Sequence, residues 1–291
     1  MKNTHKLYTD VIAKSGSKNE PLEVTANGTY EAPKGTGYSP VKVNVKLEGN
    51  PLQYVIDNRG GDGKPSCEYL FYKYKGASLD SALSAIDTSS VTSMFHMFDS
   101  CSNLKTIPIL DTSSVTNMEN MFHDCNKLTT IPLLDTSSVT TMYQMFYRCY
   151  NLKTIPLLDT SSVTSMSNTF DNCKNLTTIP LLNTSNVNNM SSMFSYCSSL
   201  ISVPQLNASQ VTNFRYMFSG CSKLTSIGIY GFRYSIDITP TALEHDAIVA
   251  LLNQAGTAYN SSQKITMGSA KLALLSDEEK AIATNKGWTL A

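Results

Sequence analysis

The chain has 291 residues with 23 basic and 23 acidic side chains, so it carries no formal net charge, and only 16% of its residues are charged. This composition provides no basic field, and we expect no nucleic-acid binding. No run of about 18 apolar residues occurs, so we expect no membrane insertion. The opening MKNTHKLYTDVIAKSG lacks the apolar core of a signal peptide, and no export signal is expected in the chain as written.

Residues 1–20 are interpreted as an attachment segment, and residues 21–49 as a small β module. Within the module, LEVTANGTYEAP places Asn27-Gly28 between β-rich flanks, which is a strong hairpin signal. The stretch YSPVKVNVKL indicates a further strand.

Residues 50–85 are predicted to be a linker and a degenerate repeat that caps the N-terminal end of a repeat array at 86–229. The apolar spacing of a repeat is present there with a short insertion, at Leu70, Phe71, Tyr74 and Leu79. Cys67 falls outside the register of the other cysteines.

Residues 86–229 consist of a 24-residue unit repeated six times without insertion. The units begin at Ile86, Leu110, Leu134, Leu158, Leu182 and Leu206. A period between about 20 and 50 residues is the signature of a solenoid, whose units bury their apolar faces against one another. Within a unit, LxxIPLL predicts a short strand, DTSS a turn, and VTxMxxMFxxC a short helix or 3₁₀ turn.

The apolar columns of the repeat are expected to face the shared interior. They are the columns of Val91, Met94, Met97, Phe98, Cys101, Leu104 and Ile107, each recurring every 24 residues, with Thr169 interrupting the Met97 column and Phe214 ending the Met94 column. Most of the methionines are therefore interpreted as core residues.

Six of the seven cysteines share one column: Cys101, Cys125, Cys149, Cys173, Cys197 and Cys221. Equivalent positions of stacked units lie about 4.8 Å apart with parallel side chains, which is poor geometry for disulfides. We therefore expect buried free thiols, and the absence of CxxC-like pairs predicts no metal site of that type.

A polar column holds Asp87, Asp111, Asp135 and Asp159, followed by Asn183 and Asn207. A line of carboxylates could hold calcium, but the glycine-rich pattern of calcium-binding β-rolls is missing. Since asparagine serves equally well in an Asx turn, turn formation is the favoured role.

Residues 230–291 are predicted to form a compact C-terminal cap of helix, strand, helix and strand. Thr241-Ala-Leu-Glu244 and Ser276-Asp-Glu-Glu279 have the pattern of capping boxes that open helices. KITMG and GWTLA indicate short strands.

The pattern MFxxCxxLxxIP joined to DTSSVTxM resembles the BspA-like leucine-rich repeats of bacterial surface proteins and of proteins of their phages. This resemblance covers about 70–229 and implies an α/β, leucine-rich-repeat-like solenoid. The asparagine ladder of the commoner LxxLxLxxN repeat is absent, so horseshoe curvature is not implied. The stretch ITMGSAKLALLSDEEKAIATNKGWTLA resembles the ending of many such proteins of gut bacteria and phages. ANGTYEAPKGTGYSPVKVNV resembles a short β motif of phage tail-associated proteins.

The resemblance implies non-catalytic adhesion or receptor recognition. Columns that vary between units are not needed to form the core, and several carry aromatic or charged residues suited to a binding surface. These candidate partner-binding residues are Phe95, His96, Glu119, Tyr143, Gln144, Tyr147, Arg148, Tyr150, Tyr196, Arg215 and Tyr216. The alternative is that they are ordinary solvated positions on a purely structural element.

An enzyme is not expected. The four histidines lie in no HExxH, GxSxG or phosphate-loop setting. Pairs such as Cys101 with His96 or Cys125 with His123 exist, but units without the histidine keep the cysteine. No cofactor or metal is expected.

The expected location is a phage particle, with the protein made in the host cytoplasm. Residues 1–49 would attach it to other virion proteins, and the repeats would contact a protein or glycan of the host surface. The alternatives are a BspA-type adhesin on the bacterial surface and a structural virion or assembly component. The sequence leaves the oligomeric state open.

Overall fold

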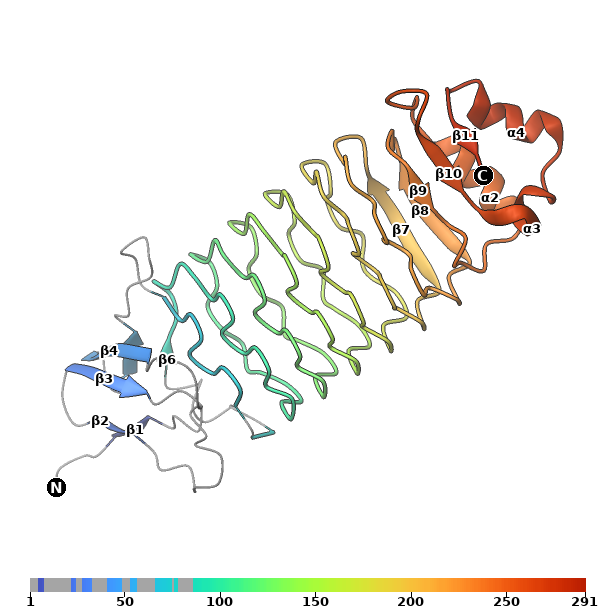
Figure 1. The fold of residues 1–291 in the computed structure, drawn as a ribbon. Coiled ribbons are helices and arrows are strands. Elements are labelled where there is room, and N and C mark those ends of the chain that lie inside the picture. Colours follow the sequence, from blue (N-terminus) through green and yellow to red (C-terminus); the bar gives the residue numbers. More distant parts are fainter. Residues whose placement is uncertain are drawn as a thin grey trace.

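The computed structural model describes residues 66–74, 76–77 and 88–291 with their side chains, and the backbone of the strands within 5–7, 22–24, 28–32, 41–48, 53–56 and 86–87. The array of repeats runs between an N-terminal group of strands and a C-terminal cap (Figure 1). Most of the predicted attachment segment, the Asn27 turn and Leu79 lie outside the described residues.

The N-terminal strands form two sheets. β1 (His5–Leu7) pairs antiparallel with β2 (Leu22–Val24), while β3 (Gly28–Ala32), β4 (Val41–Glu48), β5 (Gln53–Ile56) and β6 (Ile86–Asp87) form a sheet in that order. The predicted strand in YSPVKVNVKL is confirmed as β4. The predicted hairpin across Asn27-Gly28 is wrong, because β2 and β3 belong to different sheets. β3 pairs instead with β4 over five residues, from Gly28 opposite Val45 to Ala32 opposite Val41, while β2 pairs with β1.

The repeats stack in parallel, one period apart. Isolated parallel bridges join each unit to the next: Ser93 to Asn117, Asn117 to Thr141, Thr141 to Ser165, Ser165 to Asn189, and Asn189 to Asn213. The chain therefore has the predicted repeat fold, with one coil per 24 residues (Figure 1).

An additional coil precedes the six units. Ser66 bridges to Ser93, an offset of 27 residues, and the Phe71 and Phe98 rings stack with centroids 5.5 Å apart. This offset is the predicted short insertion. It also confirms that Cys67 lies outside the cysteine register, because Cys67 lies 27 residues before Met94 and occupies the equivalent of that buried core position.

The segment predicted as a short helix or 3₁₀ turn is a series of overlapping turns with bonds between residues three apart, and not a helix. In the fourth unit every second N–H group donates to a carbonyl of the next coil. The donors are the N–H groups of Met166, Asn168, Phe170 and Asn172. Intervening N–H groups bond within the coil, as Thr169 does to the Met166 carbonyl. A helix would direct every N–H along its own axis, whereas here Asn168 and Asn172 adopt positive φ values of 55° and 63°. One set of N–H groups can therefore bond to the next coil while the other set bonds within its own coil.

The predicted strand in every LxxIPLL segment is also wrong for most coils. Within the described part of the array, strands longer than two residues occur only near the C-terminal end, where β7 (Ser202–Asn207) pairs in parallel with β8 (Ser226–Tyr230). The proline of the segment has no N–H to donate to a ladder. Pro204 lies in β7 at a register shift between β7 and β8. Gly228 of β8 lies close to it, and a Cβ added to Gly228 would be 2.8 Å from the Pro204 backbone.

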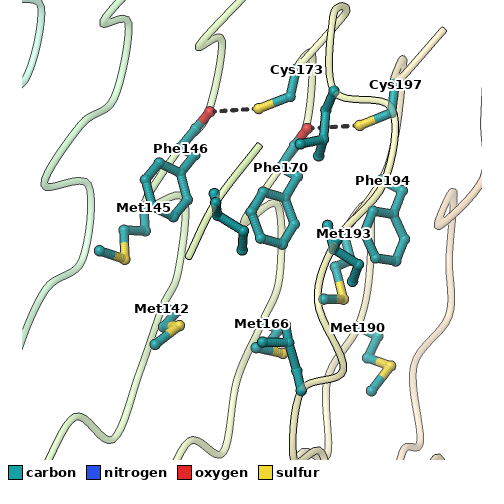
Figure 2. Packing of buried hydrophobic residues seen from close by; sticks show 14 of the residues in the cluster. Met142, Met145, Phe146, Met166, Phe170, Cys173, Met190, Met193, Phe194 and Cys197 are labelled. Atoms are coloured by element: carbon teal, nitrogen blue, oxygen red, sulfur yellow. Dashed lines mark hydrogen bonds between the residues drawn. The ribbon is translucent and has the colours of Figure 1, made fainter. Parts of the chain in front are cut away.

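The core is a continuous column of apolar side chains, and the predicted core columns are confirmed as buried. Its centre is a stack of phenylalanine rings with centroids 5.5 to 6.1 Å apart, formed by Phe71, Phe98, Phe122, Phe146, Phe170, Phe194 and Phe218. Figure 2 shows three of these rings beside the methionine columns. Thr169, which interrupts one methionine column, donates its hydroxyl to the carbonyls of Met142 and Met166.

The cysteine column consists of buried free thiols, as predicted. Each thiol of the repeats also donates a hydrogen bond to a phenylalanine carbonyl of the preceding coil, as Cys173 does to Phe146 at 3.1 Å (Figure 2). Burial raises the pKa of Cys149 and Cys173 well above the ordinary value of a thiol. These thiols are therefore protonated at neutral pH and hold neighbouring coils together.

Two polar columns stabilise the turns. The predicted Asx turns are present, since the Asp111 carboxylate accepts the Ser113 N–H at 3.0 Å and Asn207 accepts the Ser209 N–H at 3.0 Å. Beside them, buried threonine hydroxyls donate to a carbonyl of the following coil, as Thr136 does to Asp159 at 2.7 Å.

The C-terminal cap contains β9 (Ile236–Asp237), α2 (His245–Gln254), β10 (Lys264–Thr266), α3 (Gly268–Leu272), α4 (Asp277–Thr284) and β11 (Thr289–Leu290). The three strands form a parallel sheet in the order β11-β10-β9. The capping box at Ser276 and Glu279 is confirmed. The one predicted at Thr241 is wrong, because the Thr241 hydroxyl donates to the Ile238 carbonyl and α2 begins later, at His245.

None of the helices within the described residues has the length and hydropathy needed to cross a membrane.

Candidate functional site

All the predicted partner-binding residues lie on one strip of the array. We call it the turn face: the surface of residues 93–102 and of the equivalent segments 117–126, 141–150, 165–174, 189–198 and 213–222. Because the bridges stack equivalent positions, the columns of these segments run along the array. The exposed members are Tyr143, Arg148, Tyr196, Arg215 and Tyr216, and the half-buried ones are Phe95, His96, Glu119, Gln144, Tyr147 and Tyr150. They are spread over several coils and do not converge on one point.

Ring and cation contacts fix many of these side chains. At the centre of the turn face, Tyr147 stacks on His123 of the preceding coil with ring centroids 4.9 Å apart, and the Arg148 guanidinium lies 5.1 Å from the Tyr147 ring. The Lys174 ammonium lies 5.0 Å from the Tyr150 ring. Such contacts restrict the rotamers of these side chains in the free protein.

A buried carboxylate supports the N-terminal half of the turn face. Asp99 accepts hydrogen bonds from His96 Nδ1 at 2.6 Å, from His123 Nδ1 at 3.0 Å and from the Ser100 hydroxyl at 2.7 Å. Burial by itself would raise the pKa of Asp99, but the bonds from His123, His96 and Ser100 outweigh it and lower the pKa to about 2. His96 in turn stacks on Tyr69 with centroids 4.8 Å apart. Asp99 thus orients two rings of neighbouring coils.

We expect this carboxylate to make stability depend on acid pH. Because the folded pKa of Asp99 lies below the ordinary value of 3.8, its contribution is present above that pH and is lost as pH falls toward 2. A shift of this size corresponds to a contribution on the order of 2 kcal/mol. Asp99→Asn should therefore lower the free energy of unfolding in urea at pH 6, and the difference from the unchanged protein should vanish near pH 2.

Asp111→Asn is the matched control, because asparagine makes the same Asx turn at Asn183 and Asn207. It should leave the free energy of unfolding nearly unchanged at pH 6. A constant difference between Asp99→Asn and the unchanged protein from pH 6 to pH 2 would contradict the assignment.

Sequence reasoning missed several residues of the turn face. Asp99, His123, Asp124 and Lys174 contact the predicted residues there. Each of the four lies in a repeat column that supplied a predicted residue on another coil. Comparison of whole columns would therefore have found all four.

A second exposed feature lies on the LxxIPLL segments. Their outer apolar side chains are exposed by 62% to 82% and belong to Ile109, Leu133, Leu157 and Leu181. Successive residues of an extended segment point to opposite sides, so this apolar column lies outside while that of Leu110 is buried.

No group of three or more histidine, cysteine, aspartate or glutamate residues that could hold a metal ion is found in the described part of the chain.

The stacked coils and the buried Phe and Cys columns define a repeat protein. The family described as "Mycoplasma protein of unknown function, DUF285" matches residues 65–179 and 149–235. These ranges cover more than half of the chain, and the chain belongs to this family of BspA-like repeats. Comparison with curated proteins gives no significant match.

Proposed function

We propose that this protein is a non-enzymatic recognition protein whose turn face binds a protein or glycan of a bacterial cell surface. The observation that carries the proposal is the aromatic and cationic cluster around Tyr147, Arg148 and Tyr150. Tyrosine and arginine are enriched at binding hot spots, since they combine a large contact area with a polar group. The family match is compatible with a surface protein.

In this proposal the coils form a leucine-rich-repeat-like solenoid. Parallel bridges one period apart and an uninterrupted core support it. Each coil contacts mainly its neighbours in such an array, so its surface columns can vary without altering the core. That property suits a protein that must present a chosen set of side chains to a partner.

We further propose that the protein belongs to a phage particle, in or near the tail, and that residues 1–49 attach it to other virion proteins. The support is the antiparallel pair β3–β4, which lies in the segment that resembles a motif of phage tail-associated proteins. Purified particles from an induced host should contain the chain. Its presence on the surface of bacteria that produce no particles would instead support a BspA-type adhesin.

Replacing the central cluster with Tyr147→Ala, Arg148→Ala and Tyr150→Ala together should weaken binding to bacterial cells by at least about tenfold, which is about 1.4 kcal/mol. The fold should be retained, because all three side chains are at least partly exposed. Binding of the labelled full-length protein to a panel of bacterial cells measures the effect, and circular dichroism checks folding.

The matched control changes three exposed residues of the adjoining segment: Lys153→Ala, Thr154→Ala and Leu157→Ala. It should leave binding unchanged. Equal binding by both triple variants and the unchanged protein would contradict recognition by the central cluster and would favour a purely structural element.

A further inference from the structure

The backbone ladder of the turn segments ends at the sixth unit. In the fourth unit the N–H groups of Met166, Asn168, Phe170 and Asn172 donate to carbonyls of the next coil at 2.7 to 3.0 Å. The equivalent donors of the sixth unit are those of Phe214, Tyr216, Phe218 and Gly220, and none has a hydrogen-bond acceptor among the described residues. The cap follows this unit in place of a seventh coil, and its strands do not supply the missing carbonyls.

A cavity of about 400 Å³ lies at this ladder end, between the sixth unit and the cap. We call it the terminal cavity; the residues used in the argument are Phe214, Arg215, Tyr216, Tyr234, Asp237 and Gln263. Two of the unpaired N–H donors, those of Phe214 and Tyr216, therefore belong to residues of its wall. Since neither N–H group has an acceptor among the described residues, both are available to bond to a ligand that enters the cavity.

The wall of the terminal cavity is held in place by its own contacts. The Arg215 guanidinium lies 4.7 Å from the Tyr216 ring and donates to the Tyr216 hydroxyl at 3.0 Å. On the cap side, Tyr234 stacks on Tyr259 with centroids 4.8 Å apart, and the side-chain Oε1 of Gln263 accepts the Ser235 N–H at 2.9 Å. Two tyrosine rings from opposite walls are thus presented with little loss of side-chain entropy on binding.

The charges of the wall favour a neutral ligand. Arg215 and Asp237 are its only charged residues, and their formal charges cancel. One Asp237 oxygen accepts the Thr239 N–H at 2.8 Å, and the carboxylate keeps acceptor capacity for hydroxyl groups. A ligand that fits must therefore offer a carbonyl oxygen to the N–H donors, hydroxyl groups to the carboxylate and an apolar face to a tyrosine.

We propose that the terminal cavity binds an N-acetylated pyranose residue of a glycan. The acetamido carbonyl accepts from the Phe214 and Tyr216 N–H groups, the ring packs on a tyrosine, and the hydroxyls bond to Asp237. A peptide fits less well, because its own N–H groups need acceptors and the carbonyl of Arg215 already accepts from Ser192. The inference rests on the proposed recognition function and names the ligand class at one end of the same turn face.

Titration of the ¹⁵N-labelled full chain with N-acetylglucosamine tests the proposal by NMR. The amide resonances of Phe214 and Tyr216 should shift in a saturable manner. Glucose, which lacks the acetamido group, should bind at least about tenfold more weakly, the equivalent of a lost hydrogen-bonding group. Arg215→Ala should cause a similar loss without unfolding, because its side chain is exposed. Leu133→Ala, which changes an exposed apolar residue outside the turn face, is the control and should not alter sugar binding.

Three results would overturn the inference: no saturable shift with N-acetylglucosamine, equal affinity for glucose, or tighter binding of an N-acetylated dipeptide than of the sugar. These results are separable from the failure of the proposed function. If cell binding survives Arg215→Ala and no sugar binds, the recognition function stands and the terminal cavity does not serve it. If the sugar binds and no cell does, the cavity assignment stands alone.

Discussion

Phe146→Ala should lower the free energy of unfolding by about 3 to 5 kcal/mol, because it removes a fully buried ring from the middle of the array. The ring stacks between Phe122 at 5.5 Å and Phe170 at 5.6 Å, so the cavity borders two neighbouring coils. Neighbouring coils cannot collapse into it without moving backbone that is hydrogen-bonded on both sides. Urea denaturation followed by circular dichroism measures the loss.

Leu157→Ala is a matched control for this substitution, because Leu157 is also a large apolar residue but is 62% exposed. Its effect should stay within about 0.5 kcal/mol. A similar loss for both variants would show that the phenylalanine stack is not the main source of cohesion between coils.

Trp288→Ala should destabilise the cap by about 3 to 5 kcal/mol. The side chain is buried, its ring centroid lies 5.3 Å from that of Phe232, and Nε1 donates to the Gly256 carbonyl at 2.8 Å. Because coils of a repeat array interact mainly with their neighbours, the damage should remain local. Amide hydrogen exchange should accelerate in residues 230–291 and change little in residues 110–180.

Trp288→Phe is the control, since it keeps an aromatic ring and loses only the indole hydrogen bond. It should cost about 1 kcal/mol. Uniform loss of protection along the whole chain in Trp288→Ala would contradict local coupling and would mean that cap and array unfold as one unit.

Because the chain contains six versions of one unit, the core residues could be predicted by comparing equivalent positions. A column that holds phenylalanine in every unit, such as that of Phe146, can only face the shared interior, and the structure buries all its members. The same logic identified the cysteines as packing residues and the Asp111 column as Asx turns. Leu133 and its equivalents were not among the predicted core columns, and they lie on the outer side of an extended segment.

The local conformation of the turn segments could not be predicted in the same way. The spacing of Met94, Phe98 and Cys101 fits a helical period, and nothing local to one unit distinguishes that from a run of turns. What decides it is the next coil, whose carbonyls accept every second N–H group and thereby favour positive φ at positions such as His96.

The candidate site was also predicted only in part from the sequence. Variable columns pointed to Tyr147 and Arg148 as surface residues, but their contacts with His123 and Asp124 join different coils and depend on the stacking. The terminal cavity had no sequence signal at all, because it exists only where the cap interrupts the ladder.

The sequence by itself determined the period, the identity of the core columns and the set of side chains available to a partner, because each depends only on comparing equivalent positions within the chain. The tertiary structure alone decided how the backbone donors are shared between coils, which apolar residues remain outside and where the ladder ends. These depend on contacts between residues of neighbouring coils, 23 or more positions apart, which no local pattern encodes.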